Sequence, residues 1–181
     1  MKKFKLTSEF IVDISGVKLF RIKALIEFGN VKAGDLGGYI EKEENLSHMG
    51  DAWVSDDARI SGNAQVFGDA QVFGDAWVFG NARVFGNAWV SGNARVSGDA
   101  QVSGDARVSG DKDYAYAHGF GSCNRTTTFF RLKDGDVGVR CGCFYGTLAQ
   151  FRDKVCETHG ETKKAQEYLM LADLMEIRFK N

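Results

Sequence analysis

The stretch GDAQVFGDAWVFGNARVFGNAWV, residues 68–90, is one six-residue phrase repeated. The same phrase runs without interruption from residue 50 to residue 109, which makes ten hexads. Alanine stands third in every hexad and Val or Ile stands fifth, while Gly stands first in nine of the ten and Asp or Asn stands second in all. A period this regular indicates a repeat architecture, in which each unit packs on its neighbours.

The two constant apolar positions decide what the repeat builds. The third and fifth residues lie two apart, so in an extended strand both side chains point to one side, and the fourth and sixth point to the other. Gly followed by Asp or Asn suits the turn between strands, because both residue types tolerate positive φ. One hexad cannot bury its Ala–Val pair alone, whereas stacked hexads can. The tract is therefore predicted to form a solenoid with alanine and valine inside.

The pattern V-[SF]-G-[DN]-A-[RQW] resembles the hexapeptide repeat of left-handed parallel β-helix proteins. The resemblance implies left-handed coiling, three hexads in each triangular coil, and the aliphatic and small residues inside. Ten hexads then make a little over three coils, a prism roughly 16 Å long at about 4.8 Å per coil. Residues 36–49 are expected to add one more coil, because Ile40 and Leu46 keep the spacing of six before a two-residue slip.

Segments outside the hexads carry a second resemblance. The stretches VKLFRIKAL, VKAGDLGGYIEKEENLS and GCFYGTLAQF resemble poorly characterised hexapeptide-repeat proteins of bacteria and their phages, which are often provisionally labelled transferases. This resemblance spans nearly the whole chain. It brings no established activity with it, so function has to be argued from the residues of this chain.

The chain is expected to be mainly β and to divide into three parts. Residues 1–35 form an N-terminal β cap, a hairpin around Ser15 and Gly16, because the open end of a β-helix leaves backbone groups unpaired. Residues 36–111 form the β-helix, and residues 112–181 form a small C-terminal α+β module.

The C-terminal module is predicted to have the order β-β-α-α. Two strands flank a four-residue turn at residues 133–136. Thr147 and Gln150 form a capping-box pattern at the start of a helix that ends at Gly160. A second helix is expected over residues 163–179.

Composition excludes some classes of function. The net charge of −1 gives no electrostatic reason to expect nucleic acid or an anionic membrane as partner. The N-terminal residues lack the apolar run of a signal peptide, and no stretch approaches the roughly 18 apolar residues of a membrane span. Four cysteines without a secretion signal are expected to be reduced thiols, so we expect a cytoplasmic protein.

Three cysteines and a histidine recur in a pattern similar to zinc ligands, Cys141-x-Cys143 followed by Cys156-x-x-His159. Cys143 comes just before the predicted helix, whereas Cys156 and His159 lie well along it, some 14–18 Å away at about 1.5 Å per residue. Spacing therefore argues against a shared metal site and against a Cys143–His159 nucleophile pair. We predict core cysteines, and no metal or cofactor.

Acyl transfer is the enzymatic alternative that the resemblance offers. Hexapeptide acyltransferases generally need a histidine base and often a loop that projects from the coils. The ten hexads contain no histidine and are not interrupted. His48, just before them, is the one candidate base, and a turn residue is the simpler interpretation of it.

The outward positions of the coils carry aromatic rings and arginines, which we name the aromatic belt. Three interpretations stay open: burial in a homo-oligomer, with a trimer ahead of a dimer; stacking that strengthens the ladder; or a groove for a ligand, centred on the tryptophan between two arginines. Face by face, the belt residues are Trp53, Phe73 and Trp89; Arg59, Trp77, Phe79 and Arg95; and Phe67 with Phe85, beside Arg83.

A second candidate surface lies on the predicted C-terminal hairpin. If Leu132 pairs with Val137, then Phe129, Arg131 and Arg140 share its outer side. A patch of this composition could hold the phosphate and base of a nucleotide, or it could be a solvated face.

We therefore expect a non-catalytic, cytoplasmic β-helix scaffold or binding protein that self-associates through the aromatic belt, with the C-terminal module as its interaction element. The alternative is a phage-type anti-defence protein that sequesters a small nucleotide or a host protein. An acyltransferase is the second alternative.

Overall fold

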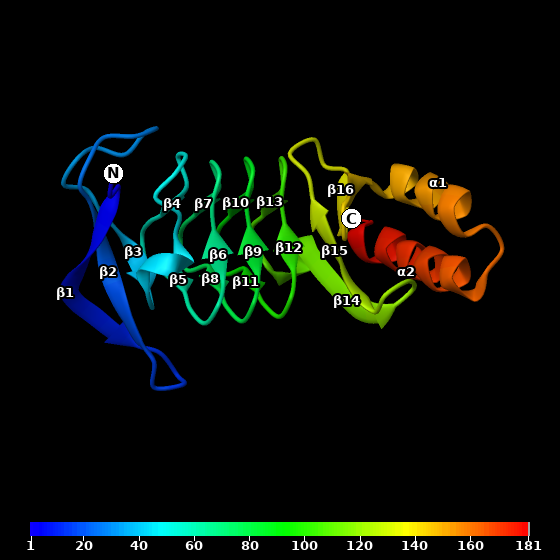
Figure 1. The fold of residues 1–181 in the computed structure, drawn as a ribbon, viewed down its shortest axis with the longest axis horizontal. Coiled ribbons are helices and arrows are strands. Elements are labelled where there is room, and N and C mark those ends of the chain that lie inside the picture. Colours follow the sequence, from blue (N-terminus) through cyan, green and yellow to red (C-terminus); the bar gives the residue numbers. More distant parts are fainter. Residues whose placement is uncertain (181) are drawn as a thin grey trace.

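The computed structural model describes residues 1–180 and shows a parallel β-solenoid of roughly four turns between two caps. In Figure 1 the N-terminal hairpin closes one end of the solenoid, and a sheet with two helices closes the other. Within residues 1–180, no helix is long and apolar enough to cross a membrane.

Each hexad contributes one two-residue strand, and strands 18 residues apart pair in parallel, so that the coils have three faces. The first face has the strand order β4-β7-β10-β13, the second continues from β3 as β5-β8-β11, and the third has the order β6-β9-β12. The strands are β4 Trp53–Val54, β5 Arg59–Ile60, β6 Gln65–Val66, β7 Gln71–Val72, β8 Trp77–Val78, β9 Arg83–Val84, β10 Trp89–Val90, β11 Arg95–Val96, β12 Gln101–Val102 and β13 Arg107–Val108.

Alanine and the branched aliphatic residue of every hexad are buried, as the period predicts. The turns need the left-handed backbone region. Gly80 has a φ of 73°, and a Cβ there would lie 3.1 Å from the backbone nitrogen of Gly98 in the next coil. Asp56 replaces glycine in one hexad and keeps a φ of 55°, a conformation that aspartate tolerates better than most residues. Turn geometry, rather than the identity of the residue, is therefore common to all hexads.

The N-terminal segment forms an antiparallel sheet that merges with the second face. Strands β1 (Phe4–Val12), β2 (Lys18–Ala24) and β3 (Leu36–Ile40) pair in that order, and β3 then pairs in parallel with β5. A short 3₁₀ helix, η1 (Glu43–Asn45), follows. Ile40 pairs with Ile60 and Leu46 bridges to Val66, each 20 residues apart, which confirms the additional coil and its two-residue slip.

The N-terminal end of the solenoid presents carbonyl oxygens, because backbone N–H groups in the coils donate toward the C-terminal end. Side-chain donors occupy these carbonyls. Lys3 Nζ donates to the carbonyl oxygens of Gly50 (3.1 Å) and Ala52 (2.7 Å), and Asn45 Nδ2 donates to those of Gly62 (3.1 Å) and Ala64 (2.8 Å). The N-terminal cap therefore supplies hydrogen-bond donors to the open end of the coils.

The C-terminal end of the solenoid presents backbone N–H groups, and the residues that cover this end supply hydrogen-bond acceptors. Gln101 N–H donates to Thr128 Oγ1 (2.9 Å), Arg95 N–H to an Asp111 carboxylate oxygen (2.9 Å), and Ser97 N–H to the Tyr114 hydroxyl (3.2 Å). Burial raises the pKa of Tyr114. Asp111 belongs to a second 3₁₀ helix, η2 (Asp111–Asp113), where the hexads stop.

The C-terminal module has four antiparallel strands rather than the two predicted. They are β14 (Tyr114–Phe120), β15 (Arg125–Arg131), β16 (Val137–Cys141) and β17 (Phe144–Thr147). The strand β17 is short and contains glycine, which depletes its strand signal. Pairing of Tyr114 with Phe130 attaches β14 to the predicted hairpin.

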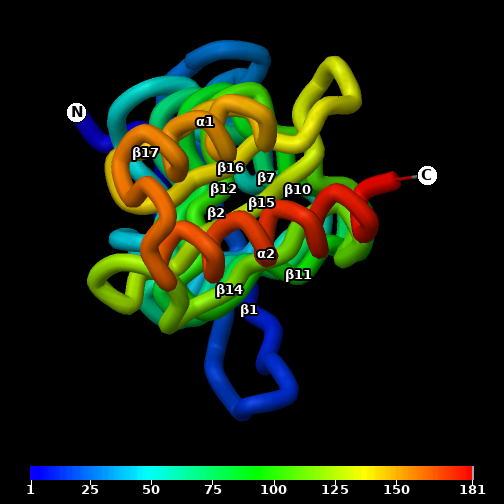
Figure 2. The backbone as a smooth tube through the Cα atoms, turned by 90° about the vertical axis from the view of Figure 1, so that its right-hand side faces the viewer, coloured from blue at the N-terminus to red at the C-terminus, as the bar shows by residue number. Residues whose placement is uncertain are grey.

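Both predicted helices are confirmed. Helix α1 (Leu148–His159) begins at the Thr147–Gln150 capping box and ends at Gly160, and α2 (Lys163–Phe179) follows. Figure 2 shows the two helices crossing the end of the solenoid. Alternate residues of β15 serve two cores: Phe129 packs under the helices, and Phe130 packs on the coils.

The buried ammonium of Lys3 predicts a pH dependence of stability. Burial lowers the pKa of Lys3 from 10.5 to about 8, although the nearby negative charges of Asp51 and Asp69 act to raise it. Between these values the unfolded chain binds more protons than the folded protein, so stability should rise with pH. We expect the unfolding free energy of the wild type, relative to Lys3→Met, to rise by up to about 3 kcal/mol across this window. Denaturant unfolding of both proteins at a series of pH values measures this difference in unfolding free energy. A difference that does not change with pH would contradict the prediction.

The acceptor role of Thr128 predicts a second effect on stability. Thr128→Val keeps the shape of the side chain and leaves the Gln101 N–H unpaired, which should cost about 1–3 kcal/mol of unfolding free energy. The neighbouring Thr127 is also buried, but its hydroxyl donates to the Cys141 sulfur (3.2 Å). Because sulfur is a weak acceptor, Thr127→Val is the matched control and should cost less. Equal losses would show that Thr128 acts through packing alone.

Candidate functional site

On the first face the belt rings cover one another in part. Phe73 meets Trp89 edge to face at 6.0 Å between centroids, and the Arg107 guanidinium lies 4.4 Å from the Trp89 ring centre. Trp89 is 46% exposed, the most exposed ring of the belt. Trp53 was expected on the outer surface, and that expectation is wrong: Phe28 packs against it at 5.4 Å and leaves it 4% exposed. The N-terminal segment folds back over this ring.

On the second face the register predicted from the sequence is confirmed. Arg59 pairs with Trp77, and Trp77 pairs with Arg95. The Trp77 ring packs on Phe79 with 4.7 Å between centroids, and its indole N–H donates to the Ser61 hydroxyl at 3.2 Å. These contacts hold the tryptophan against its own coil and its neighbour.

The third face carries the most regular stack. Phe67 and Phe85 are parallel within 3°, with 4.8 Å between centroids. The Arg140 guanidinium, from β16, lies 5.3 Å from the Phe85 centre and continues the stack into the C-terminal module. Arg83 neighbours this column at the fourth position of its hexad, as predicted, and is exposed.

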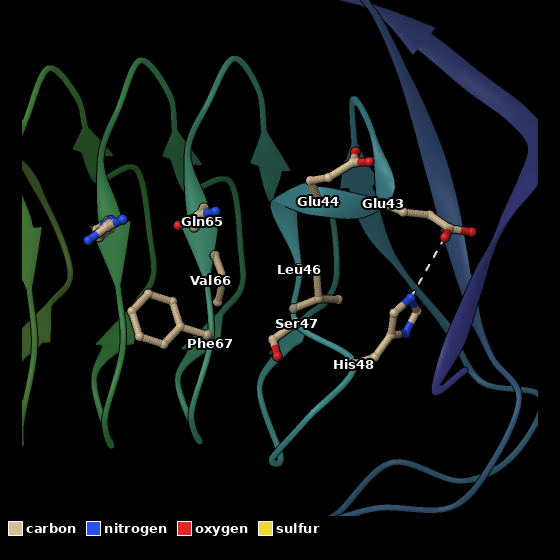
Figure 3. A pocket seen from close by; sticks show the side chains of 9 residues that line it. Glu43, Glu44, Leu46, Ser47, His48, Gln65, Val66 and Phe67 are labelled. Carbon is tan, nitrogen blue, oxygen red and sulfur yellow. Dashed lines mark ion pairs between the residues drawn. The ribbon is translucent and has the colours of Figure 1, made fainter. Parts of the chain in front are cut away.

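A groove of about 680 Å³ opens below Phe67, where the regular coils meet the N-terminal cap. Figure 3 shows its labelled side chains, with His48 beside Glu43 at one end and Phe67 at the other. The lining residues are Glu43, Glu44, Leu46, Ser47, His48, Gln65, Val66, Phe67 and Arg83.

His48 is held by the N-terminal strand on several sides. The backbone N–H of Lys3 donates to His48 Nδ1 (3.2 Å), and the ring stacks on Phe4 at 4.3 Å. His48 Nε2 lies 3.8 Å from a carboxylate oxygen of Glu43. Because Nδ1 already accepts, the proton of the neutral ring belongs on Nε2, toward the carboxylate. This geometry supports a structural role for His48, in contact with the N-terminal strand, rather than the role of a general base.

Glu43 is tied to the other side of the cap. Lys2 Nζ donates to both of its carboxylate oxygens, at 2.8 and 2.9 Å. The hydrogen bond from Lys2 and the nearby His48 hold the pKa of Glu43 below its usual value. The negative charge of Glu43 is therefore offset, whereas Glu44, which also lines the groove, takes part in none of the ion pairs within residues 1–180.

The predicted basic-aromatic patch does not exist as one surface. Arg131, rather than Leu132, pairs with Val137, so the hairpin register is shifted by one residue. Phe129 is fully buried beneath the helices and meets Phe151 edge to face. Arg131 lies on that helical side and donates to the Phe179 carbonyl oxygen (2.8 Å), whereas Arg140 faces the coils. A one-residue register shift moves every side chain to the opposite face.

The spacing argument left out strand β17, which lies between Cys143 and α1. The missed strand β17 leads away from Cys143 and α1 returns, so Cys141, Cys143 and His159 line one pocket of about 190 Å³ with Tyr168. The prediction of core cysteines is wrong for Cys143 and Cys156, which are both exposed, and Cys156 lies outside this pocket. Burial raises the pKa of Tyr168. Within residues 1–180, no group of three or more His, Cys, Asp or Glu residues is placed to hold a metal ion.

Two surface features were missed from the sequence. The groove beside Phe67 depends on residues 43–48, which lie outside the regular hexads. The outer side of α2 exposes Met170, Leu174 and Ile177, at 70, 55 and 69%. The spacing of four and three residues could have revealed this apolar stripe, because such residues share one side of a helix.

The three-faced parallel coils with buried alanine and valine define a β-helix repeat protein. The coils match the family model described as YdcK beta solenoid repeat, over residues 58–74, 76–92, 88–101 and 100–111. Together with the fold, this match supports a β-helix repeat family for the coils. A comparison with curated proteins finds no match.

The stacking of Arg140 on Phe85 predicts an energetic coupling between the coils and the C-terminal module. In a double-mutant cycle of Phe85→Ser and Arg140→Gln, we expect a coupling of about 0.5–2 kcal/mol in unfolding free energy. The same cycle with Phe73→Ser, on the first face, should give a value near zero. Equal coupling in both cycles would contradict a direct contact.

Proposed function

We propose that this protein is a non-catalytic scaffold that self-associates, with the outer stripe of α2 as the principal contact. The observation that carries the proposal is the exposure of Met170, Leu174 and Ile177 along one side of this helix. The opposite side of α2 already packs in the module core through residues that include Tyr168 and Met175. The stripe is therefore not needed for the core of its own chain, and monomers seldom leave such a surface in water.

A second copy of the chain is the partner that best fits this stripe. Two-fold interfaces use the same patch on both subunits, and an apolar stripe is complementary to itself. Two α2 helices can pack antiparallel along it. The aromatic belt is the weaker contact surface, because its rings stack on one another and Trp89, at 46%, is the most exposed of them. This favours a dimer over the trimer that was expected from the belt.

Light-scattering mass tests the self-association. We expect the wild type to have twice the monomer mass, and the Leu174→Gln/Ile177→Gln double variant to shift to the monomer, because the interface loses its apolar area. Lys164→Gln is the control, since Lys164 is exposed on another side of the same helix. Trp89→Gln separates the belt from α2. A monomeric wild type would contradict the proposal, and dissociation by Trp89→Gln alone would assign the interface to the belt.

Sequestration of a nucleotide or of a host protein is the second candidate function. The groove beside Phe67 favours it, because it combines an aromatic wall with an exposed arginine in one concave site. Acyl transfer is less well supported, because Nδ1 of His48 already accepts a hydrogen bond from Lys3.

A further inference from the structure

The column of stacked groups on the third face stops one coil before the N-terminal end of the solenoid. Arg140 lies over Phe85, and Phe85 stacks on Phe67. The next position down belongs to Ser47, because Leu46 bridges to Val66 and the Ser47 N–H donates to the Val66 carbonyl oxygen. Ser47 therefore provides a hydroxymethyl group where the ladder would place a ring.

The open position has the dimensions of one more stacked ring. Phe67 and Ser47 both line the groove, and in Figure 3 none of the drawn side chains lies between them. Neighbouring coils are about 4.8 Å apart, and stacked aromatic rings place their centroids about 4.5–7 Å apart. A planar group from outside the chain can therefore occupy the step at Ser47 and stack on Phe67.

The polar side of the groove continues beyond this step. Gln65 and Arg83 line both the groove and a neighbouring hollow of about 430 Å³, whose other walls are Asn63, Asn81, Asp99 and Gln101. Arg83 is exposed, and none of the ion pairs within residues 1–180 involves it. An arginine beside an aromatic platform recognises an anionic group on a flat ligand, since guanidinium matches phosphate geometry.

We propose that the third face binds a nucleotide, whose base stacks on Phe67 over Ser47 and whose phosphate lies against Arg83. The inference rests on the second candidate function, ligand sequestration, and is independent of self-association through α2. The Lys2–Glu43 pair offsets one carboxylate at the far end of the groove. Glu44 also lines the groove and takes part in none of the ion pairs within residues 1–180, so the proposal places the anion on the side of Arg83. Gln65 offers both a donor and an acceptor to the edge of the base or sugar.

Calorimetric titration with guanosine monophosphate and adenosine monophosphate tests the site. Ribose phosphate is the ligand control, because it has the anion without the base. We expect both nucleotides to bind, and ribose phosphate to bind at least about tenfold more weakly, because it lacks the stacking contact. In the protein, Ser47→Phe fills the step and should abolish binding, and Phe67→Ser should weaken it about tenfold. Serine at this position is native in other hexads, as at Ser91, so this variant keeps the repeat.

Arginine variants locate the phosphate. Arg83→Gln should weaken binding at least about tenfold, because a charge-assisted contact is lost. Arg95→Gln is the matched control: it has the same hexad position on the second face and should leave affinity unchanged. Nucleotide binding that survives Ser47→Phe would overturn this site and leave sequestration elsewhere intact. Failure of both nucleotides to bind, or equal binding of ribose phosphate, would overturn the inference, and host-protein capture would then be the surviving form of sequestration.

Discussion

The direction of the backbone hydrogen bonds along the coils is the constraint on which the rest of the structure depends. Every coil donates its N–H groups toward the C-terminal end and offers its carbonyl oxygens toward the N-terminal end. One open end therefore needs donors and the other needs acceptors. Lys3 and Asn45 supply the donors, and Thr128, Tyr114 and Asp111 supply the acceptors. The two caps have different chemistry because the ladder between them has a direction.

Because the shaft is filled by alanine and valine, the outer wall is free to vary from hexad to hexad. Part of this freedom is used for stability, as in the column that runs from Phe67 through Phe85 to Arg140 and joins the coils to the C-terminal module. The same column ends at Ser47, in an open groove. One end of this column therefore stabilises the junction with the C-terminal module, and the other end forms a wall of the candidate binding site. The exposed stripe of α2 lies on a separate element and serves the proposed contact with a second copy.

The sequence predicted the coils well and the site in part. The hexad period gave the inward residues through strand alternation. The resemblance to hexapeptide-repeat β-helices implied three hexads in each coil, and an 18-residue coil then gave the three faces and the Phe67–Phe85 stack. The capping box at Thr147 located α1 for a similar local reason. Trp53 was misplaced because the covering ring, Phe28, comes from a distant segment with no period. The Phe129 patch failed because hairpin register is decided by the loop and by packing, and a shift of one residue exchanged its faces.

The sequence by itself determined the solenoid, its inward residues and the outward column of rings, since each follows from a repeated local pattern. Only the tertiary structure decided which rings are covered, that Cys143 and His159 share a pocket, and that a groove opens beside Ser47. The reason is physical: these features arise where non-repeating segments fold back onto the coils or onto one another. Such long-range contacts depend on how separate elements pack, which no single hexad encodes.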